Sequence, residues 1–186
     1  MGRPAQTSRA EILQTALAIA DEHGLDAVTM QAVARRLGVT AMALYRHVTN
    51  KDGLLDGLVE LLLTGLPRPP ADLPWSGRLV RFAEGMREIA ARHSGVFLLL
   101  LQRPARTDAA LDVRNSVTAA LREAGLRPED AARAERLLST AVIGFAASEA
   151  AGRFTHHDKS VRDADFAFLV KSLRGMVNDM ISGMVG

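Results

Sequence analysis

Apolar residues recur at intervals of three and four positions along most of the chain, and stretches that alternate apolar and polar residues are nearly absent. This period is typical of amphipathic helices, so the pattern predicts an all-α fold. Prolines then divide the chain, because after Pro4 there is none until Pro67, where PRPPADLP holds four in eight residues. Such a cluster interrupts helices, so we predict two helical regions joined near residue 67.

The first region predicts four helices from its caps and closing glycines. Ser8 and Glu11 have the capping-box spacing ahead of an apolar stripe that ends at Gly24. Gly38 closes a second, short helix, as glycine commonly does. The expected helices, with N-caps at Ser8, Thr29, Thr40 and either Thr49 or Asn50, cover residues 8–24, 29–38, 40–47 and 49–66.

The second region predicts longer helices with a larger apolar surface. Between Leu137 and Ala147 one helix is apolar on nearly all sides, so it must be buried by several neighbours. The last helix carries a single apolar stripe on one face. The expected helices cover roughly residues 76–93, 95–102, 108–124, 129–152 and 163–184.

Composition excludes several classes of protein. There is no cysteine, which rules out a disulfide framework, thiolate zinc sites and cysteine nucleophiles. The longest apolar run, VFLLLL at 96–101, is too short to span a bilayer, and no apolar segment of a signal peptide follows Arg3. We therefore expect a cytoplasmic protein with no membrane partner. The net charge of +2 does not by itself indicate a nucleic-acid partner.

Residues 29–47 form a helix-turn-helix pattern, in which a tight turn joins two short helices. At about 100° per residue, Leu44 and Val48 lie together as the core face of the third helix. Met42 and Arg46 then point almost directly away from the core. This layout places an unpartnered, partly basic face on the surface of a small helical domain.

The flanks of the same helix carry Tyr45 and His47, each roughly 80° from the core direction. A helix in the major groove of DNA meets base edges with its outward face and phosphates with its flanks. Charge agrees, because the stretch between Asp26 and Asp52 has no acid but holds four basic residues, Arg35, Arg36, Arg46 and Lys51. The pattern suggests a DNA-facing surface, although a basic helix pair with a half-buried Tyr45 is also a common structural arrangement.

The segment ILQTALAIADEHGLDAVTMQAVARRLGVTAMALYRHVTNKDGLLDGL resembles the DNA-binding domain of the TetR family of bacterial transcriptional regulators. The matching features are EHGLDAVTM, VARRLGVT, LYRHV and NKDGLLD, and the resemblance covers residues 8–58 without a gap. It implies a three-helix DNA-binding domain over 1–49, a connecting helix over 50–66 and a helical effector-binding and dimerisation domain over 67–186.

The resemblance also implies roles for individual positions. A protein of this kind binds as a homodimer to a pseudo-palindromic operator in double-stranded DNA. Ala41, Met42 and Ala43 depart from a polar reading helix, so readout would rest on Arg46, Gln31 and apolar contacts. The implied phosphate contacts are Thr29, Tyr45, His47 and Lys51, and the implied base-reading positions are Gln31, Thr40, Ala41, Met42 and Arg46.

The resemblance further implies a dimer interface on the last two long helices. Small residues in the 129–152 helix permit close helix approach, and the 163–184 helix supplies an apolar stripe. The alternative is that both helices pack only within one chain. The expected interface residues are Leu137, Ala141, Gly144, Phe166, Leu169, Leu173, Val177 and Met180.

An effector pocket is implied among the middle helices. Its apolar lining predicts a mainly apolar small-molecule ligand, although each lining residue is also explained as plain core. Glu149 could orient the ligand, pair with an arginine across the dimer or face water. The expected lining residues are Phe82, Met86, Phe97, Leu101, Val113, Val117, Leu121, Phe145 and Glu149.

The sequence thus predicts a DNA-binding transcriptional regulator, a repressor that its ligand releases through the 50–66 helix. The first alternative is a helix-turn-helix protein without an effector, and the second is this fold without DNA binding. An enzyme is not expected, because no acid, base and nucleophile converge. Neither a metal nor a cofactor is expected, because the neighbours His156 and His157 lack the three- or four-residue spacing of a chelating pair on a helix.

Overall fold

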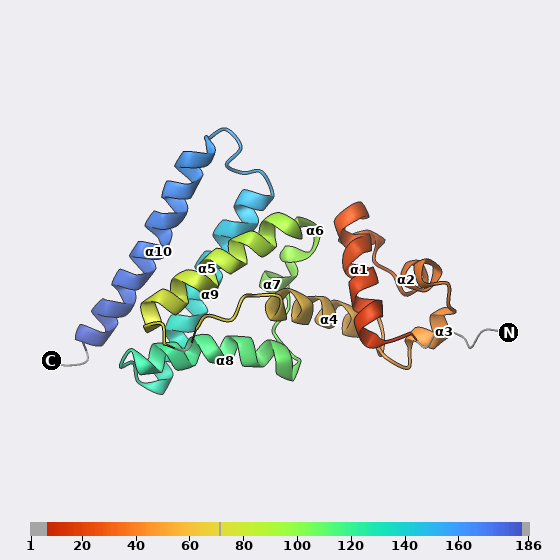
Figure 1. Cartoon of the computed structure of the whole chain (residues 1–186), viewed down its shortest axis with the longest axis horizontal. Helices are drawn as coiled ribbons and strands as arrows, with labels where there is room; N and C mark the ends of the chain where they lie inside the picture. Colours follow the sequence, from red (N-terminus) through yellow and green to blue (C-terminus); the bar gives the residue numbers. More distant parts are fainter. Residues whose placement is uncertain (1–6, 71, 184–186) are drawn as a thin grey trace.

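The structure, a computed structural model, describes residues 7–70 and 72–183. Every element in this part of the chain is helical, so the all-α prediction is confirmed (Figure 1). The elements in chain order are α1 (Arg9–His23), a 3₁₀ turn η1 (Leu25–Ala27), α2 (Met30–Leu37), α3 (Ala41–Leu44), α4 (Lys51–Thr64), α5 (Trp75–Arg92), α6 (Ser94–Phe97), α7 (Leu99–Gln102), α8 (Asp108–Glu123), α9 (Pro128–Ala150) and α10 (Lys159–Ser182).

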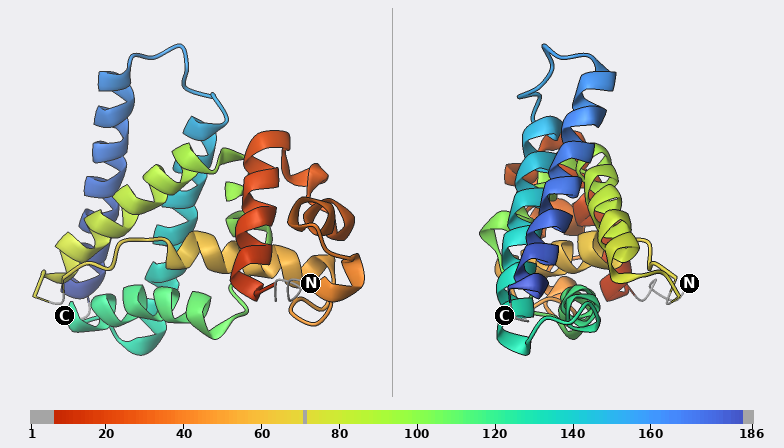
Figure 2. Two further views of the ribbon diagram at one scale, coloured as in Figure 1. Left: turned by 45° about the vertical axis from the view of Figure 1, so that its right-hand side comes forward. Right: turned by 90° about the vertical axis from the view of Figure 1, so that its left-hand side faces the viewer.

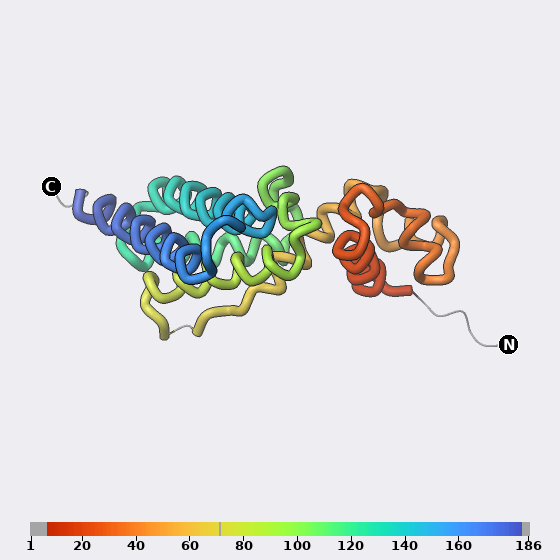
Figure 3. The backbone as a smooth tube through the Cα atoms, turned by 90° about the horizontal axis from the view of Figure 1, so that it is seen from above, coloured from red at the N-terminus to blue at the C-terminus, as the bar shows by residue number. Residues whose placement is uncertain are grey.

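The helices form two parts that α4 connects. Helices α1 to α3 lie together at one end of the molecule, and α5, α8, α9 and α10 make up the other part (Figure 1). Helix α4 runs from the first part into the second, α7 lies beside it, and α6 contacts α1 where the two parts meet (Figure 3). Helices α9 and α10 lie next to each other at the end away from α1 to α3 (Figure 2).

The predicted caps hold three of the four N-terminal helices. Ser8 and Glu11 form a complete capping box, in which the Glu11 N–H donates to Ser8 Oγ (3.2 Å) and the Ser8 N–H donates to Glu11 Oε2 (2.8 Å). The hydroxyl of Thr29 caps α2 as predicted. Asn50, rather than Thr49, caps α4 through its side-chain oxygen. These local hydrogen bonds fix where the helices begin.

The third helix is shorter than its predicted range. It ends at Leu44 instead of about His47, because the N–H groups of His47 and Val48 both donate to the Leu44 carbonyl (2.9 and 3.0 Å). The resulting tight turn carries Val48 into the core, where only 5% of the side chain is exposed. Thr40 is the N-cap residue of this helix, as predicted, but its side chain makes no capping hydrogen bond.

Other boundaries in the second half of the chain also differ. The expected 95–102 helix is two short helices, α6 and α7, that meet at Leu98. Helix α10 begins at Lys159, four residues before the expected start, and the Lys159–Asp163 ion pair (2.6 Å) spans its first turn. Its predicted end at residue 184 lies outside the described residues. Helix α4 ends at Thr64, two residues earlier than expected.

A large hydrophobic core runs through both parts of the molecule. Leu54 and Leu58 of α4 are completely buried, and the same core includes residues of α1, α5, α6 and α9. Gly95 brings α6 against the end of α1, because a Cβ at this position would lie 2.6 Å from the Ala20 carbonyl oxygen. The position of α1 to α3 is therefore coupled by packing to the helices of the second part.

Candidate DNA-binding surface and ligand cavity

The third helix and its following turn present the outward face that the sequence predicted. Leu44 is completely buried, whereas Met42 is 73% exposed and Tyr45 is 48% exposed. Ala41 is partly buried and packs against the core, so its side chain offers little to a partner. The other predicted contact residues on the surface are Gln31, Thr40, Arg46, His47 and Lys51, which are exposed, and Thr29, which is partly buried.

The basic residues of this region are not equally free. Arg36 donates two hydrogen bonds of 2.6 Å to the carboxylate of Glu22 on α1. Its positive charge is therefore neutralised within the domain. This donation holds the pKa of Glu22 below its ordinary value. Within residues 7–70 and 72–183, Arg46 and Lys51 form no ion pair with a carboxylate. In the described residues Arg35 on α2 also forms none, so the unpaired positive charge of the first part lies on α2, at the turn after α3 and at the start of α4.

The N-terminus of α4 adds to this charge. The first amide groups of a helix have no partner within the helix, and the helix dipole makes this end favourable for an anion. Lys51 is the first residue of α4, and Tyr45, Arg46 and His47 lie in the turn just before it. Together they make an exposed basic surface that suits a phosphate backbone.

Three sets of polar contacts lie where the two parts of the molecule meet. Arg9 of α1 donates to both carboxylate oxygens of Glu60 on α4 (2.7 and 3.0 Å). His93, which follows α5, lies with Nδ1 2.8 Å from a carboxylate oxygen of Asp21 on α1. Arg103, after α7, contacts the beginning of α4. Arg9 thus joins α1 to α4, whereas His93 and Arg103 hold α1 and α4 against the second part.

The pKa of Glu60 and that of Arg103 are both shifted. The hydrogen bonds from Arg9 hold the pKa of Glu60 below its ordinary value, so this carboxylate stays ionised. Donation to the Asp56 carboxylate raises the pKa of Arg103. Both shifts favour the charged forms that form the contacts.

A cavity of about 390 Å³ lies between the end of α4, the proline segment, α5 and α8. Four of the predicted pocket residues line it: Phe82, Val113, Val117 and Leu121. Its apolar wall is completed by Leu66, Pro67, Pro69, Trp75, Leu79 and Ala120, and its polar lining is Thr64, Arg68, Arg78, Asp112 and Ser116. Its size is within the range of small-molecule sites.

The remaining predicted pocket residues do not line this cavity. Met86 and Phe97 are each 1% exposed and belong to the close-packed core. Leu101 is 46% exposed on the surface of α7. Phe145 packs against two other rings, those of Phe154 and Phe166, with centroids 5.2 and 5.5 Å apart. Periodicity identified apolar positions but could not separate cavity walls from close-packed core.

Arg78 is the cationic side chain of α5 at this cavity. Its guanidinium pairs with Glu123 at the end of α8. Its Nε is buried and has no hydrogen-bond partner in the part of the chain that the structure describes. A buried donor without a partner is uncommon, so the wall near Arg78 is the most polar point of a mostly apolar site.

Both parts of the chain match models of known protein families. Residues 12–58 match the model of the bacterial regulatory proteins of the tetR family. Residues 79–173, half of the chain, match the tetracyclin repressor-like C-terminal domain. The chain belongs to the TetR family. The first match contains the basic turn, and the second contains the helices that carry most of the cavity.

Individual members of the family show the extent of the similarity. The chain is 30% identical over 161 residues to the HTH-type transcriptional repressor DrrR1 of Streptomyces coeruleorubidus, covering 83% of this chain but only 58% of that repressor. A TetR variant from Acinetobacter baumannii in complex with minocycline superposes with a TM-score of 0.82 at 25% identity, over 94% of this chain and 98% of that one. BioQ with its double-stranded DNA operator gives a TM-score of 0.70 at 25% identity, over 90% and 98%.

The last two helices leave part of their surface uncovered. On α9, Leu137 is 56% exposed, Ala141 is partly exposed, and the α-carbon of Gly144 faces open space. On α10, Phe168 is 72% exposed, although the sequence had not singled it out. Both helices therefore offer apolar or small residues to a partner.

The predicted stripe on α10 divides between two sides of the helix. Phe166 and Val177 are 6% and 0% exposed, so they belong to the core of their own chain and correct the interface prediction. Leu169, Leu173 and Met180 are partly buried. The apolar positions on α10 recur at the predicted helical spacing. The middle of the stripe packs against α5 and α9, because this contact buries the apolar surface of all three helices.

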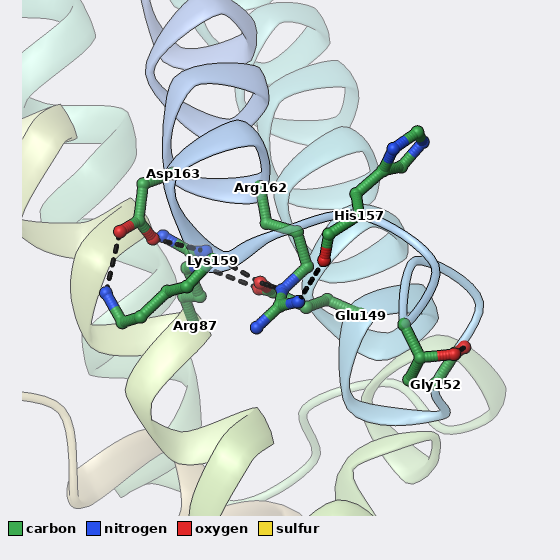
Figure 4. A network of polar contacts seen from close by, with 8 residues as sticks. Arg87, Glu149, Gly152, His157, Lys159, Arg162 and Asp163 are labelled. Atoms are coloured by element: carbon green, nitrogen blue, oxygen red, sulfur yellow. Dashed lines mark hydrogen bonds and ion pairs between the residues drawn. The ribbon is translucent and has the colours of Figure 1, made fainter.

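Glu149 lies in an ion-pair network between α5, α9 and α10 (Figure 4). Arg87 donates to both carboxylate oxygens of Glu149 (2.6 Å each), and Arg162 Nε lies 3.3 Å from Glu149 Oε1. Arg87 also pairs with Asp163 (2.8 Å) and lies over the Phe166 ring, 4.8 Å from its centroid. Glu149 thus pairs with two arginines of its own chain.

The same network lines a second, more open groove of about 1010 Å³. Hydrogen bonds from Arg87 hold the pKa of Glu149 below its ordinary value. The groove is lined by charged side chains of both signs, most of them already paired with each other. Its main role in the described structure is to fasten α10 to α5 and α9.

Among residues 7–70 and 72–183, no group of three or more histidine or acidic side chains is arranged to hold a metal ion. In the same residues, no helix is long and apolar enough to cross a membrane.

Replacing Glu149 with Gln tests the network. We expect Glu149→Gln to lower the free energy of unfolding at pH 7 by about 1–2 kcal/mol, because two charge-assisted hydrogen bonds are lost. The lowered pKa of Glu149 means that its stabilisation is complete above its ordinary pKa and is lost as the pH falls through the lowered value. The difference between wild type and variant, measured by urea unfolding, should shrink as the pH falls below about 4.

Glu84→Gln is the matched control. Glu84 pairs with Arg81 at 3.4 Å, but both side chains are exposed. Exposed pairs contribute little, so this variant should unfold like the wild type across the pH range. An equal loss of stability in the two variants would show that the Arg87 network has no special role.

Proposed function

We propose that this protein is a sequence-specific DNA-binding transcriptional repressor that a small, mainly apolar ligand releases from its operator. The observation that carries the proposal is the exposed basic turn of residues 45–47 beside Lys51, on a chain whose two halves match the TetR family. It acts as a regulator and not as an enzyme, and its place of action is the cytoplasm, where its DNA lies.

The DNA-reading roles follow from exposure and charge. Met42 and Arg46 reach furthest from the core, so Arg46 supplies the polar base contact and Met42 an apolar one. Tyr45, His47 and Lys51 contact phosphates, Lys51 at the N-terminus of α4. The BioQ–operator complex, a neighbour in fold, supports DNA as the partner of this face.

The protein acts as a homodimer through α9 and α10. Leu137 and Phe168 expose apolar surface on these helices, and burial of such surface is the main driving force of association. Gly144 faces open space, which permits a second helix to approach closely. A two-fold dimer then presents two basic turns to the two halves of a pseudo-palindrome.

The ligand binds in the cavity of about 390 Å³ beside the end of α4. Thr64 and Leu66 line this cavity, and Lys51 stands at the opposite end of the same helix. A ligand that displaces the end of α4 changes the position of the DNA-binding part, so it lowers DNA affinity by its preference for that conformation. The TetR variant in complex with minocycline, a neighbour in fold, supports a small-molecule ligand.

DNA binding is tested with fluorescence anisotropy on the DNA immediately upstream of the gene, at several salt concentrations. The wild type should outcompete random DNA and weaken with salt, because phosphate contacts release counterions. Arg46→Ala should cost about 1–3 kcal/mol and relax sequence preference, whereas Lys51→Gln should weaken binding to all sequences and lower the salt slope by about one.

Arg174→Ala is the control for charge, because Arg174 is exposed on α10 at the other end of the molecule. This variant should bind the upstream DNA like the wild type. If the wild type shows no preference for that DNA, a genome-wide selection of bound fragments follows. Failure to enrich any sequence there would refute the proposed function.

The dimer is tested with Phe168→Glu. Placing a carboxylate on the exposed apolar face should convert the protein from two chains to one in analytical ultracentrifugation, because a buried unpaired charge is strongly unfavourable. Operator affinity should fall with it. Leu98→Glu is the control, since Leu98 is similarly exposed (47%) but lies between α6 and α7. A dimeric Phe168→Glu variant would contradict the interface.

The cavity is tested by filling it. Val117→Phe should occupy the space beside Phe82 and Leu121 and abolish ligand binding while operator binding persists. A panel of polycyclic compounds that includes minocycline is screened by thermal shift. A bound compound should raise the melting temperature of the wild type but not that of Val117→Phe. Ala109→Phe, on the exposed side of α8, should respond like the wild type. A compound that stabilises Val117→Phe equally would bind elsewhere.

A further inference from the structure

Helix α4 has an acidic face that arginines hold from two sides. Asp52, Asp56 and Glu60 are four residues apart, so they lie along the same side of the helix. Arg9, from the DNA-binding part, pairs with Glu60. Arg103, from the segment after α7, pairs with Asp52 and Asp56. The cations that neutralise this face therefore come from different parts of the chain.

Arg103 holds the first two turns of α4 with three hydrogen bonds. Its Nε donates to Asp56 Oδ1 (2.9 Å), Nη1 donates to Asp52 Oδ1 (3.1 Å), and Nη2 donates to the Asp52 carbonyl oxygen (3.3 Å). The Arg103 and Asp56 side chains are only 20% and 17% exposed. A planar guanidinium with several donors suits this arrangement, which a lysine could not reproduce.

The position of these carboxylates matters for a polyanionic partner. Asp52 directly follows Lys51, and its side chain is 74% exposed. Charges within about 8 Å interact appreciably at physiological salt, so a phosphate held at Lys51 would be repelled by an unpaired Asp52. The carboxylates of Asp52 and Asp56 together carry a charge of −2. Pairing with Arg103 brings the net charge of the cluster to −1, which weakens that repulsion.

We propose that Arg103 is a positioning residue that sustains DNA affinity by neutralising Asp52 and Asp56 beside the phosphate-facing end of α4. The inference rests on the proposed function. It adds a way in which the second part of the chain controls DNA binding without changing the residues that touch DNA. Any ligand that draws the segment after α7 away from α4 leaves two carboxylates unpaired near the phosphates and favours release.

The test measures the affinity of the dimer for its selected operator in a double-mutant cycle. Arg103→Gln should weaken binding about five- to tenfold, a typical size for coupling between sites. The Asp52→Asn/Asp56→Asn variant should bind at least as tightly as the wild type, because it loses both carboxylates and keeps the charge of Arg103. Combining all three substitutions should restore binding at least to the wild-type affinity, since neutral amides do not repel phosphate.

Arg106→Gln is the matched control. Arg106 is an exposed cation of the same segment, and the described residues give it no ion-pair partner. This variant loses the same charge and should bind like the wild type. Thermal unfolding of every variant confirms that each is folded at the temperature of the binding assay.

The outcomes separate the two proposals. Wild-type protein that binds no DNA selectively refutes the proposed function, and with it this inference. Selective binding by the wild type with unchanged affinity in Arg103→Gln overturns the role of Arg103 alone. If Arg103→Gln weakens binding but the two asparagines do not restore it, Arg103 acts by packing and the neutralisation proposed here is wrong.

Discussion

The fold depends on the burial of helix α4 from both sides. The part formed by α1 to α3 is only about forty residues long, and a chain segment of that size buries too little apolar surface to be stable alone. Leu54 and Leu58 complete its core, and further along the same helix Leu62 packs among residues of the second part. The two parts therefore share one hydrophobic core, and neither can be displaced without disturbing α4.

The shared core makes α4 a physical link between the basic turn and the cavity. Its first residue, Lys51, stands beside the exposed turn of residues 45–47, and Thr64 at its other end lines the cavity. A helix transmits displacement along its axis because its hydrogen bonds keep it stiff. Binding at either end then biases the other by a common conformational equilibrium, as linkage requires.

Polar contacts also connect the two parts of the molecule. Polar contacts where the two parts meet join charged groups of α1 or α4 to arginines or to His93, and the pairs are only partly exposed. Pairs of this kind contribute modest stability, but they fix orientation, since each guanidinium must keep its geometry with the carboxylate. The Arg87 network does the same at the far end, where it holds α10 to α5 and α9. The charged residues thus set relative positions within a molecule that apolar burial holds together.

Much of the fold could be predicted because its signals are local. The Ser8–Glu11 box, the Thr29 cap and the closing Gly38 act within a few residues, and the helical period of the apolar positions reports which side of a helix is covered. The same arithmetic placed Leu44 inside and Met42 and Arg46 outside. Such features depend on neighbours along the chain, so the sequence alone contains them.

Tertiary structure decided whatever depends on partners distant in sequence. Glu149 pairs with Arg87, 62 positions away, and Arg103 pairs with Asp56, 47 positions away. No local pattern in the sequence encodes those pairings. Apolar periodicity could not tell that Phe82 and Val117 line a cavity while Met86 and Phe97 fill the core, because both kinds of position need the same residue types. Sequence by itself therefore determined the helices and the outward face of the DNA-binding part. The packing of those helices decided which side chains remain available for a ligand, a second chain or DNA.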